Sequence, residues 1–218
     1  MGLEERLRWF FVEWYKQNGR CFPWREPTTT PFGVMIAELM LRKTKAEMVA
    51  KSWPTFIATY PKPSSCVAVK NELLIEILAP LGLGNLRAKA IKDISVLLVA
   101  RYDDRVPNSI GELMSLPHVG EYSANAVACF AFGQTTPIVD GNVMRILCRL
   151  FGKNMPKDIR RAPDVWDLAT KILPTSETRE HNYGLLDFGA QVCKSRHQTC
   201  DTCSLSIVCT YNHQNERG

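Results

Sequence analysis

Four cysteines near the C-terminus could hold a metal centre. Cys193, Cys200, Cys203 and Cys209 follow the spacing C-x6-C-x2-C-x5-C and fall within 17 residues. Thiolates select zinc or the iron of iron–sulfur clusters. A four-thiolate zinc site usually brings two close C-x2-C pairs, and only Cys200 and Cys203 form such a pair here. The spacing therefore favours a 4Fe–4S cluster, with a zinc knuckle or two disulfides as the alternatives.

The start of the chain bears on the redox state of these thiols. Residues 1–6 are charged and lack the apolar stretch of a secretory signal. No uninterrupted apolar run approaches the length that crosses a membrane. We therefore expect a cytoplasmic protein with reduced thiols and no membrane partner, which argues against disulfides.

Size and charge permit several kinds of partner. With 218 residues and 45% hydrophobic content, the chain can form one domain or two small lobes. A net charge of +5 is compatible with nucleic acid but does not require it. Basic residues cluster at Arg42, Lys43 and Lys45, at Arg87, Lys89 and Lys92, and at Lys157, Arg160 and Arg161. Most such clusters are solvated helix faces, so charge alone leaves DNA binding undecided.

Apolar residues recur at three- and four-residue steps, which predicts an all-α protein. The first helix begins near Leu3 and ends before Gly19. The other predicted helices span 34–43, 46–60, 72–78, 86–102, 110–116, 122–132, 142–151 and 162–173. No stretch alternates with period two for long enough to predict a strand.

A short turn between two of these helices could bind phosphate. Residues 116–120 read Leu-Pro-His-Val-Gly, and the next helix follows directly. The backbone N–H groups at the start of that helix, together with its dipole, would form an anion site suited to a DNA phosphate. An ordinary helical corner is the alternative.

About twenty residues later, Asp140 lies where a loop passes into a helix, so it is at least a candidate N-cap. The hairpin, the Gly/Pro-rich loop ending in Asp140 and the four-cysteine loop occur in this order along the chain. Together they resemble the helix-hairpin-helix DNA glycosylase superfamily, in the branch related to endonuclease III. The resemblance extends from Phe22-Pro23-Trp24-Arg25 to Cys209.

The resemblance implies a two-lobed fold and a chemical mechanism. A six-helix lobe with the hairpin would span 25–137, and a 4Fe–4S cluster lobe would combine 1–24 with 138–218. Double-stranded DNA with a mismatched or damaged base would be bent, and one nucleotide would be flipped into a pocket. Asp140 would stabilise the oxocarbenium-like sugar and orient a water molecule. The protein would act as a monomer, in a prokaryotic cell and in association with the nucleoid.

The resemblance also assigns supporting residues. DNA contacts fall on Arg42, Lys43, Asn85, Val119, Gly120, Lys194 and Arg196. Arg145 would hydrogen-bond the cluster, and Asn142 would cap or brace the Asp140 loop. His118 stands where the family usually has Gly, and it would strain the turn if its φ is positive.

Tyr122 indicates the type of reaction. Bifunctional relatives carry Lys at this position after the hairpin, and its amine forms a Schiff base that permits strand cleavage. Tyr cannot form an imine, so the resemblance implies a monofunctional glycosylase that uses water. A residue of the helix core is the alternative explanation for Tyr122.

Glu38 is an acid in a largely apolar helical run. Burial would raise its pKa and suit it to donate a proton or position water. The alternative is an exposed residue that pairs with a nearby Lys or Arg. In the adenine mismatch glycosylases, a Glu here protonates the departing base.

Several segments favour thymine over adenine as the base removed. Leu-Arg-Lys-Thr at 41–44, Gly-Leu-Gly-Asn at 82–85, Tyr122 and the ending nine residues after Cys209 resemble the thymine–guanine mismatch glycosylases of thermophilic archaea. Adenine enzymes have two glutamines where this chain has Arg42 and Lys43, and they have a second C-terminal domain. The expected substrate is thymine or uracil opposite guanine. The alternatives are adenine opposite guanine or 8-oxoguanine, and a DNA damage-binding module without catalysis.

Overall fold

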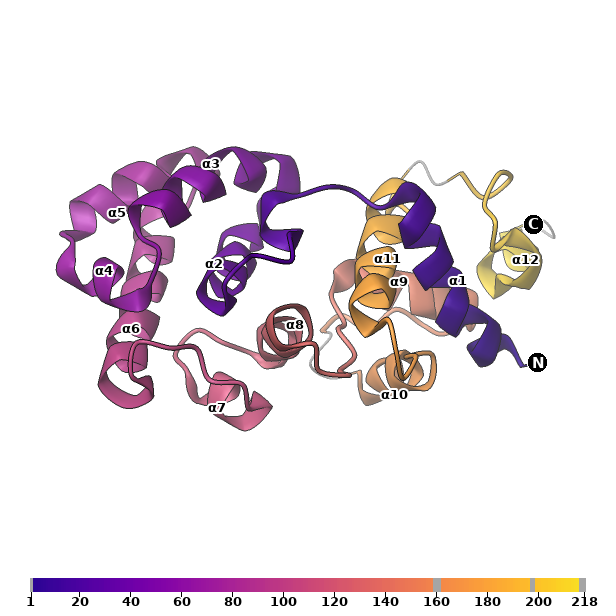
Figure 1. The fold of residues 1–218 in the computed structure, drawn as a ribbon. Helices are drawn as coiled ribbons and strands as arrows, with labels where there is room; N and C mark the ends of the chain where they lie inside the picture. The colour runs from indigo at the N-terminus through magenta and orange to yellow at the C-terminus, as the bar shows by residue number, and fades with distance from the viewer. Residues whose placement is uncertain (1, 159–161, 197–198, 216–218) are drawn as a thin grey trace. The chain divides into compact units, whose positions relative to one another are not determined.

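A computed structural model of the chain describes residues 2–158, 162–196 and 199–215 (Figure 1). Throughout these ranges the ordered elements are helices and no strand occurs, which confirms the all-α prediction. The chain divides into two compact units. We call Met1–Arg20 with Gln134–Gly218 the N/C unit, and Cys21–Gly133 the middle unit. In the described part of the chain, no helix is both long and apolar enough to span a membrane.

The middle unit has seven α-helices, one more than the resemblance implied. They are α2 (Pro31–Leu41), α3 (Ala46–Thr59), α4 (Pro63–Ala68), α5 (Asn71–Leu78), α6 (Gly84–Tyr102), α7 (Ile110–Ser115) and α8 (Glu121–Phe132), with 3₁₀ turns η1 (Pro23–Arg25) and η2 (Ala79–Leu81). The sequence prediction missed α4, which begins at a proline.

Helix α2 is the centre of this unit. Every residue from Phe32 to Met40 is buried, as expected of a helix that is apolar on all sides. It contacts α3, α6 and α8. Thr30 caps it by accepting the N–H of Gly33 at 3.1 Å, and Pro31 occupies the first turn. This burial fixes the position of Glu38.

The N/C unit contains α1 (Leu3–Asn18), α9 (Gly141–Leu150), α10 (Pro163–Lys171), α11 (Thr178–Gln191), the 3₁₀ turn η4 (Ser206–Val208) and α12 (Thr210–Asn215). Helices α1 and α11 lie side by side (Figure 1). Their close approach requires Gly184, because a Cβ there would lie 2.1 Å from the carbonyl oxygen of Phe11. Phe188 packs against Phe10, Phe11 and Trp14 in edge-on contacts at 5.3 to 5.7 Å.

The sequence analysis did not predict α11. Its buried face carries polar residues and glycine as well as apolar residues: Thr178, His181, Asn182, Gly184, Asp187 and Gly189. The apolar periodicity is therefore weak, although the helix is the main packing partner of both α1 and α9. Contacts with α1 and α9, which are distant in the sequence, stabilise these residues. Such contacts leave no periodic pattern in the sequence of α11 itself.

His181 on α11 is fully buried, and its Nδ1 lies 2.9 Å from the carbonyl oxygen of Arg8. Its Nε2 has no hydrogen-bond partner among the described residues. Burial lowers the pKa of His181 from 6.5 to about 4, and the hydrogen bond to Arg8 opposes this shift. The folded protein therefore keeps this imidazole neutral in mild acid.

We expect His181 to make folding sensitive to acid. Above pH 6.5 the imidazole is neutral in both the folded and unfolded chains. As the pH falls toward 4, only the unfolded chain takes up this proton, so the free energy of unfolding should decrease by about 3 kcal/mol. Urea unfolding of the wild type and His181→Phe between pH 7 and 4 checks this. The variant should lose less stability across the window, and equal losses would contradict the assignment.

Candidate functional site

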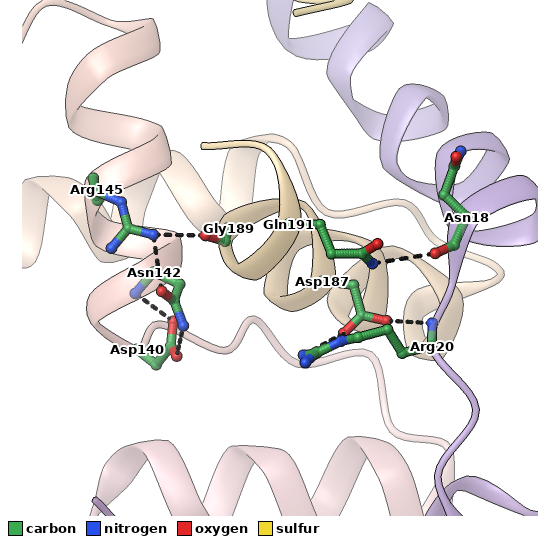
Figure 2. A network of polar contacts seen from close by, with 8 residues as sticks. All are labelled: Asn18, Arg20, Asp140, Asn142, Arg145, Asp187, Gly189 and Gln191. Carbon is green, nitrogen blue, oxygen red and sulfur yellow. Dashed lines mark hydrogen bonds and ion pairs between the residues drawn. The ribbon is translucent and has the colours of Figure 1, made fainter. Parts of the chain in front are cut away.

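Asp140 is the N-cap of α9, as its place in the sequence predicted. Its Oδ1 accepts the backbone N–H groups of Asn142 and Val143, both at 2.8 Å. Its Oδ2 accepts the side-chain amide of Asn142 at 3.0 Å, which Figure 2 shows from close by. The preceding residues Ile138 and Val139 are fully buried, so the loop that carries this carboxylate is anchored in the core.

Removal of water raises the pKa of the Asp140 carboxyl above its ordinary value. The backbone N–H groups of Val143 and Asn142, the Asn142 side chain and the charge of Arg145 act in the opposite direction. The result is a half-buried carboxylate at the positive end of a helix dipole. Such a group is held in place before any substrate arrives.

Arg145 braces this arrangement from the next turn of α9. Its Nη2 donates to Asn142 Oδ1 at 2.9 Å and to the Gly189 carbonyl at 2.8 Å (Figure 2). Its Nε donates to the carbonyl of Cys193 at 2.8 Å. A Cβ at position 189 would lie 2.6 Å from the Cβ of Asn142, so glycine permits the close packing of α9 on α11. Arg145 thus connects the Asp140 loop to the first cysteine of the four.

The four predicted ligand cysteines line one pocket. The pocket encloses about 330 Å³ of empty space, part of it open to solvent. Besides the cysteines, its lining includes Arg149 and Tyr211. Arg149 Nη1 lies 3.3 Å from the sulfur of Cys193 and donates to the Lys194 carbonyl at 2.8 Å. Its guanidinium also stacks on the Tyr211 ring at 4.7 Å.

Burial raises the pKa of both Cys200 and Cys203, and the neighbouring thiolates raise both further. Four thiols that converge on one pocket fit a group that takes four thiolate ligands. In the part of the chain that the structure describes, however, no three His, Cys, Asp or Glu side chains are arranged to hold a metal ion. Both the presence of a cofactor in this pocket and its identity therefore stay predictions.

In the middle unit, the hairpin turn joins α7 to α8. His118 has a φ of 62°, which is the left-handed conformation that the replacement of glycine was expected to strain. Its Nε2 lies 2.8 Å from Asp93 Oδ2, and Lys89 pairs with the same carboxylate oxygen at 2.8 Å. Gly120 is the exposed N-cap of α8, and a Cβ there would meet nothing within 4 Å. The N-terminal end of α8 is therefore open to a ligand.

The predicted DNA-contacting side chains differ in their surroundings. Lys43, Asn85, Lys194 and Arg196 are exposed, and Val119 is half-buried. Arg42 instead donates to the His118 carbonyl at 2.5 Å and to Ser123 Oγ at 3.1 Å. Its guanidinium thus holds the hairpin turn.

The predicted basic cluster at 87–92 does not form a surface for phosphate. Arg87 is buried, Lys89 pairs with Asp93, and Lys92 donates to the Val69 carbonyl. In the cluster at 157–161, Arg160 and Arg161 lie outside the described residues.

Glu38 and Tyr122 belong to the middle unit. Glu38 is 6% exposed within α2, so its burial matches the prediction and excludes the exposed-face alternative. Its charge interacts with that of Arg42, one turn further along. Tyr122 is half-buried in the first turn of α8.

Residues 36–169, more than half of the chain, match the profile of a family described as "HhH-GPD superfamily base excision DNA repair protein". The chain belongs to this superfamily. Among HhH-GPD relatives, a thymine-DNA glycosylase from Aeropyrum pernix is 35% identical over 96% of this chain and 96% of its own length. An adenine DNA glycosylase from Mycobacterium tuberculosis is 33% identical over 93% of this chain and 66% of its own length.

Two solved structures support the HhH-GPD fold. A thermostable thymine-DNA glycosylase matches with a TM-score of 0.91 and 30% identity, over 97% of each chain. Endonuclease III in a non-covalent DNA complex matches with a TM-score of 0.84 and 26% identity, over the whole of each chain. The resemblance inferred from the motifs is thereby confirmed.

Two arginines of this HhH-GPD protein were missed as site residues. Arg149 follows Arg145 by one helical turn, and that spacing could have indicated a second arginine directed at the cysteine loop. Arg87 was counted with a surface cluster, although the structure buries its guanidinium among main-chain carbonyls. Nothing local in the sequence distinguishes it from an exposed arginine.

Proposed function

We propose that this protein is a monofunctional DNA glycosylase that removes thymine or uracil opposite guanine. The observation that carries the proposal is the Asp140 carboxylate, fixed at the start of α9 in a member of a base excision repair superfamily. The full-length likeness to thymine-DNA glycosylases supports the choice of base.

In the proposed reaction, a flipped nucleotide loses its base to water. The bond between the sugar C1′ and the base nitrogen breaks, and its electron pair leaves with the base. Asp140 stabilises the positive charge on the sugar, orients the water that bonds to C1′ and accepts its proton. The thymine–guanine wobble pair costs less to open than a matched pair, which favours the mismatch.

The hairpin is proposed to hold a DNA phosphate. The first N–H groups of α8 have no acceptor within the helix, and the open space at Gly120 leaves them accessible. The exposed Lys43, Asn85, Lys194 and Arg196 would add contacts outside the hairpin. Since phosphate contacts read no base, selectivity must come from the lower cost of opening the mismatch and from contacts to the flipped nucleotide.

A 4Fe–4S cluster held by Cys193, Cys200, Cys203 and Cys209 is the proposed cofactor. When bound, it would supply a charged, rigid core for the loop that carries Lys194 and Arg196. Arg149 would donate toward the sulfur of Cys193, as it does in this structure. Arg145 would donate to the Cys193 carbonyl and to the Asn142 side chain. The same arginine would therefore stabilise both the cysteine loop and the Asp140 site.

Adenine removal is the second candidate, because an adenine DNA glycosylase is 33% identical over 93% of this chain. The buried Glu38 fits both candidates, with a different task in each. Adenine leaves poorly as an anion and needs a proton donor, whereas thymine and uracil leave as stabilised anions. For thymine, Glu38 need only position water. Glu38→Gln should therefore abolish adenine release but leave measurable thymine release.

A released-base assay over T:G, U:G, A:G and A:8-oxoguanine duplexes tests the proposal. We expect release from T:G and U:G first, and Glu38→Gln should keep part of it. Glu72→Gln, an exposed change on α5, is the matched control. Release of adenine alone would favour the second candidate. Binding without release from any duplex would indicate a damage-binding module.

Tyr122→Lys should convert the enzyme into one that also nicks DNA. The wild type should leave an intact abasic strand, and borohydride should trap no covalent complex, because a phenol cannot form an imine. A lysine amine at this position could attack the sugar and form a Schiff base. Denaturing gels with and without alkali, together with borohydride trapping, measure the change.

Glu121→Lys, which adds an amine one residue earlier at an exposed position, is the control for Tyr122→Lys and should not nick. Nicking and trapping by the wild type would instead assign the nucleophile to another lysine, with Lys43 and Lys45 the first candidates.

A further inference from the structure

Arg87 lies beneath two loops of the middle unit. It belongs to the first turn of α6, and only 5% of its surface is exposed. Burial lowers the pKa of its guanidinium, and no carboxylate hydrogen-bonds it among the described residues. Its partners are main-chain carbonyls and one hydroxyl. A buried arginine with neutral partners costs free energy of desolvation that a surface arginine avoids.

The guanidinium connects the end of α2 with the turn before α6. Nη2 donates to the carbonyls of Met40 at 3.2 Å and Arg42 at 2.5 Å, and to Thr44 Oγ1 at 2.5 Å. Nη1 donates to the Leu81 carbonyl at 3.2 Å and also to the Gly82 carbonyl. The planar fork of arginine can serve several acceptors at once, which the single ammonium of lysine cannot match.

Both loops have backbone conformations that need support. Lys43 has a φ of 53° and Leu83 a φ of 52°, and neither is glycine. Left-handed conformations are strained for residues that carry a Cβ. Thr44 Oγ1 also donates to the Leu81 carbonyl at 3.1 Å, so the two loops are in direct contact. The hydrogen bonds of Arg87 offset the strain on both sides of this contact.

The supported loops present exposed side chains. Leu83 is 53% exposed and Leu86 is 65% exposed, and both Lys43 and Asn85 are exposed. Arg87 also fixes the main chain of Arg42, whose own guanidinium reaches the His118 carbonyl of the hairpin. Arg87 and Arg42 together thus connect three loops: 42–44, 82–84 and the hairpin at 116–120.

We propose that Arg87 is a positioning residue that holds the 42–44 and 82–84 loops, and through Arg42 the hairpin, in the geometry that engages a mismatched base pair. This inference rests on the proposed function. Arg87 itself touches no DNA, because its guanidinium is buried among protein acceptors. It acts through Lys43, Leu83 and the hairpin, which are displaced when it is shortened.

Hydrogen exchange of the free protein tests the positioning without any DNA. In Arg87→Met, amides of 41–45 and 81–86 should exchange at least several-fold faster than in the wild type, while amides of α3 change little. Arg87→Lys should give a smaller increase, because it keeps the charge and loses the fork. Arg101→Met removes an exposed arginine from the last turn of the same helix and should change neither segment.

DNA measurements test whether this positioning serves recognition. The single-turnover rate on a T:G duplex should fall on the order of tenfold to a hundredfold in Arg87→Met, with partial rescue in Arg87→Lys. The salt dependence of binding to a matched duplex should keep the wild-type slope, because no phosphate contact is lost.

Unchanged exchange in both segments would overturn the proposal, and so would a salt slope reduced by about one, which indicates a phosphate contact. If Arg87→Met does not fold, hydrogen exchange, the single-turnover rate and the salt slope of Arg87→Lys test the proposal instead. Should the wild type release no base from any duplex, the proposed function fails, while exchange and the salt slope still decide whether Arg87 positions the loops.

Discussion

Asp140→Asn should lower the rate of base release by about a thousandfold while leaving DNA binding intact or tighter. In the proposed reaction the Asp140 charge stabilises the sugar cation, and the substitution removes this charge. Asparagine is an equally good N-cap, so its side-chain oxygen can still accept the N–H groups of Asn142 and Val143. The variant should therefore fold normally. Single-turnover release from a T:G duplex and fluorescence anisotropy measure the two effects separately.

Gly120→Asp should have the effect that Asp140→Asn lacks, because it should weaken DNA binding rather than slow the chemical step. Its φ of −103° and open surroundings accept a side chain, and Asp is a favoured N-cap. It should keep the fold but weaken binding, since a carboxylate would stand at the phosphate site. Gly120→Asn, without the charge, should bind more tightly than Gly120→Asp. Equal loss of binding in Asp140→Asn and Gly120→Asp would contradict the separation of roles.

The pH dependence of the wild type offers a check within the same assay. Burial raises the pKa of Asp140, and in the proposed reaction the carboxylate is the active form. The rate should therefore fall as the pH decreases through this raised value, at a higher pH than an ordinary aspartate would require. Asp140→Asn should lack this step.

Cys203→Ser should remove the proposed 4Fe–4S cluster and weaken DNA binding together. The wild type should be yellow-brown and contain about four iron atoms per chain. Without one of the four thiolates, the loop with Lys194 and Arg196 should lose its shape, and affinity should fall about tenfold or more through lost phosphate contacts. Iron analysis, visible absorbance and binding at two salt concentrations measure these effects.

Cys21→Ser, a change at an exposed cysteine outside the cysteine loop, should retain both iron and affinity. One zinc and no iron in the wild type would instead support a zinc knuckle. Loss of iron with unchanged binding would separate the cofactor from DNA recognition.

Local spacing predicted those parts of the site that consist of neighbouring residues. The Asp140 cap and the hairpin turn each occupy a few consecutive positions, and their geometry follows from backbone rules. The four cysteines fall within 17 residues and line one pocket. The sequence analysis tied strain at His118 to a positive φ, on the basis of the resemblance, and the structure gives a φ of 62°.

Other features depend on contacts between distant segments. Arg42 and Arg87 read as surface cations, but their acceptors come from residues 40–44, 81–82, 118 and 123. Helix α11 was missed because glycines and polar residues form much of its buried face. The start of α2 at Pro31 was missed for a different reason: the Thr30–Pro31 cap signal was overlooked.

The packing of α1 on α11 has a consequence for the order of folding during synthesis. Arg8 and His181 are in hydrogen-bond contact although 173 positions separate them. All residues of the middle unit leave the ribosome before α11 is made, so its core can close first. The aromatic face of α1, with Phe11 and Trp14, can be buried only after Phe188 has been synthesised. While the middle unit is being made, the apolar face of α1 therefore stays uncovered, and we expect it to be a binding site for a chaperone that shields apolar surface.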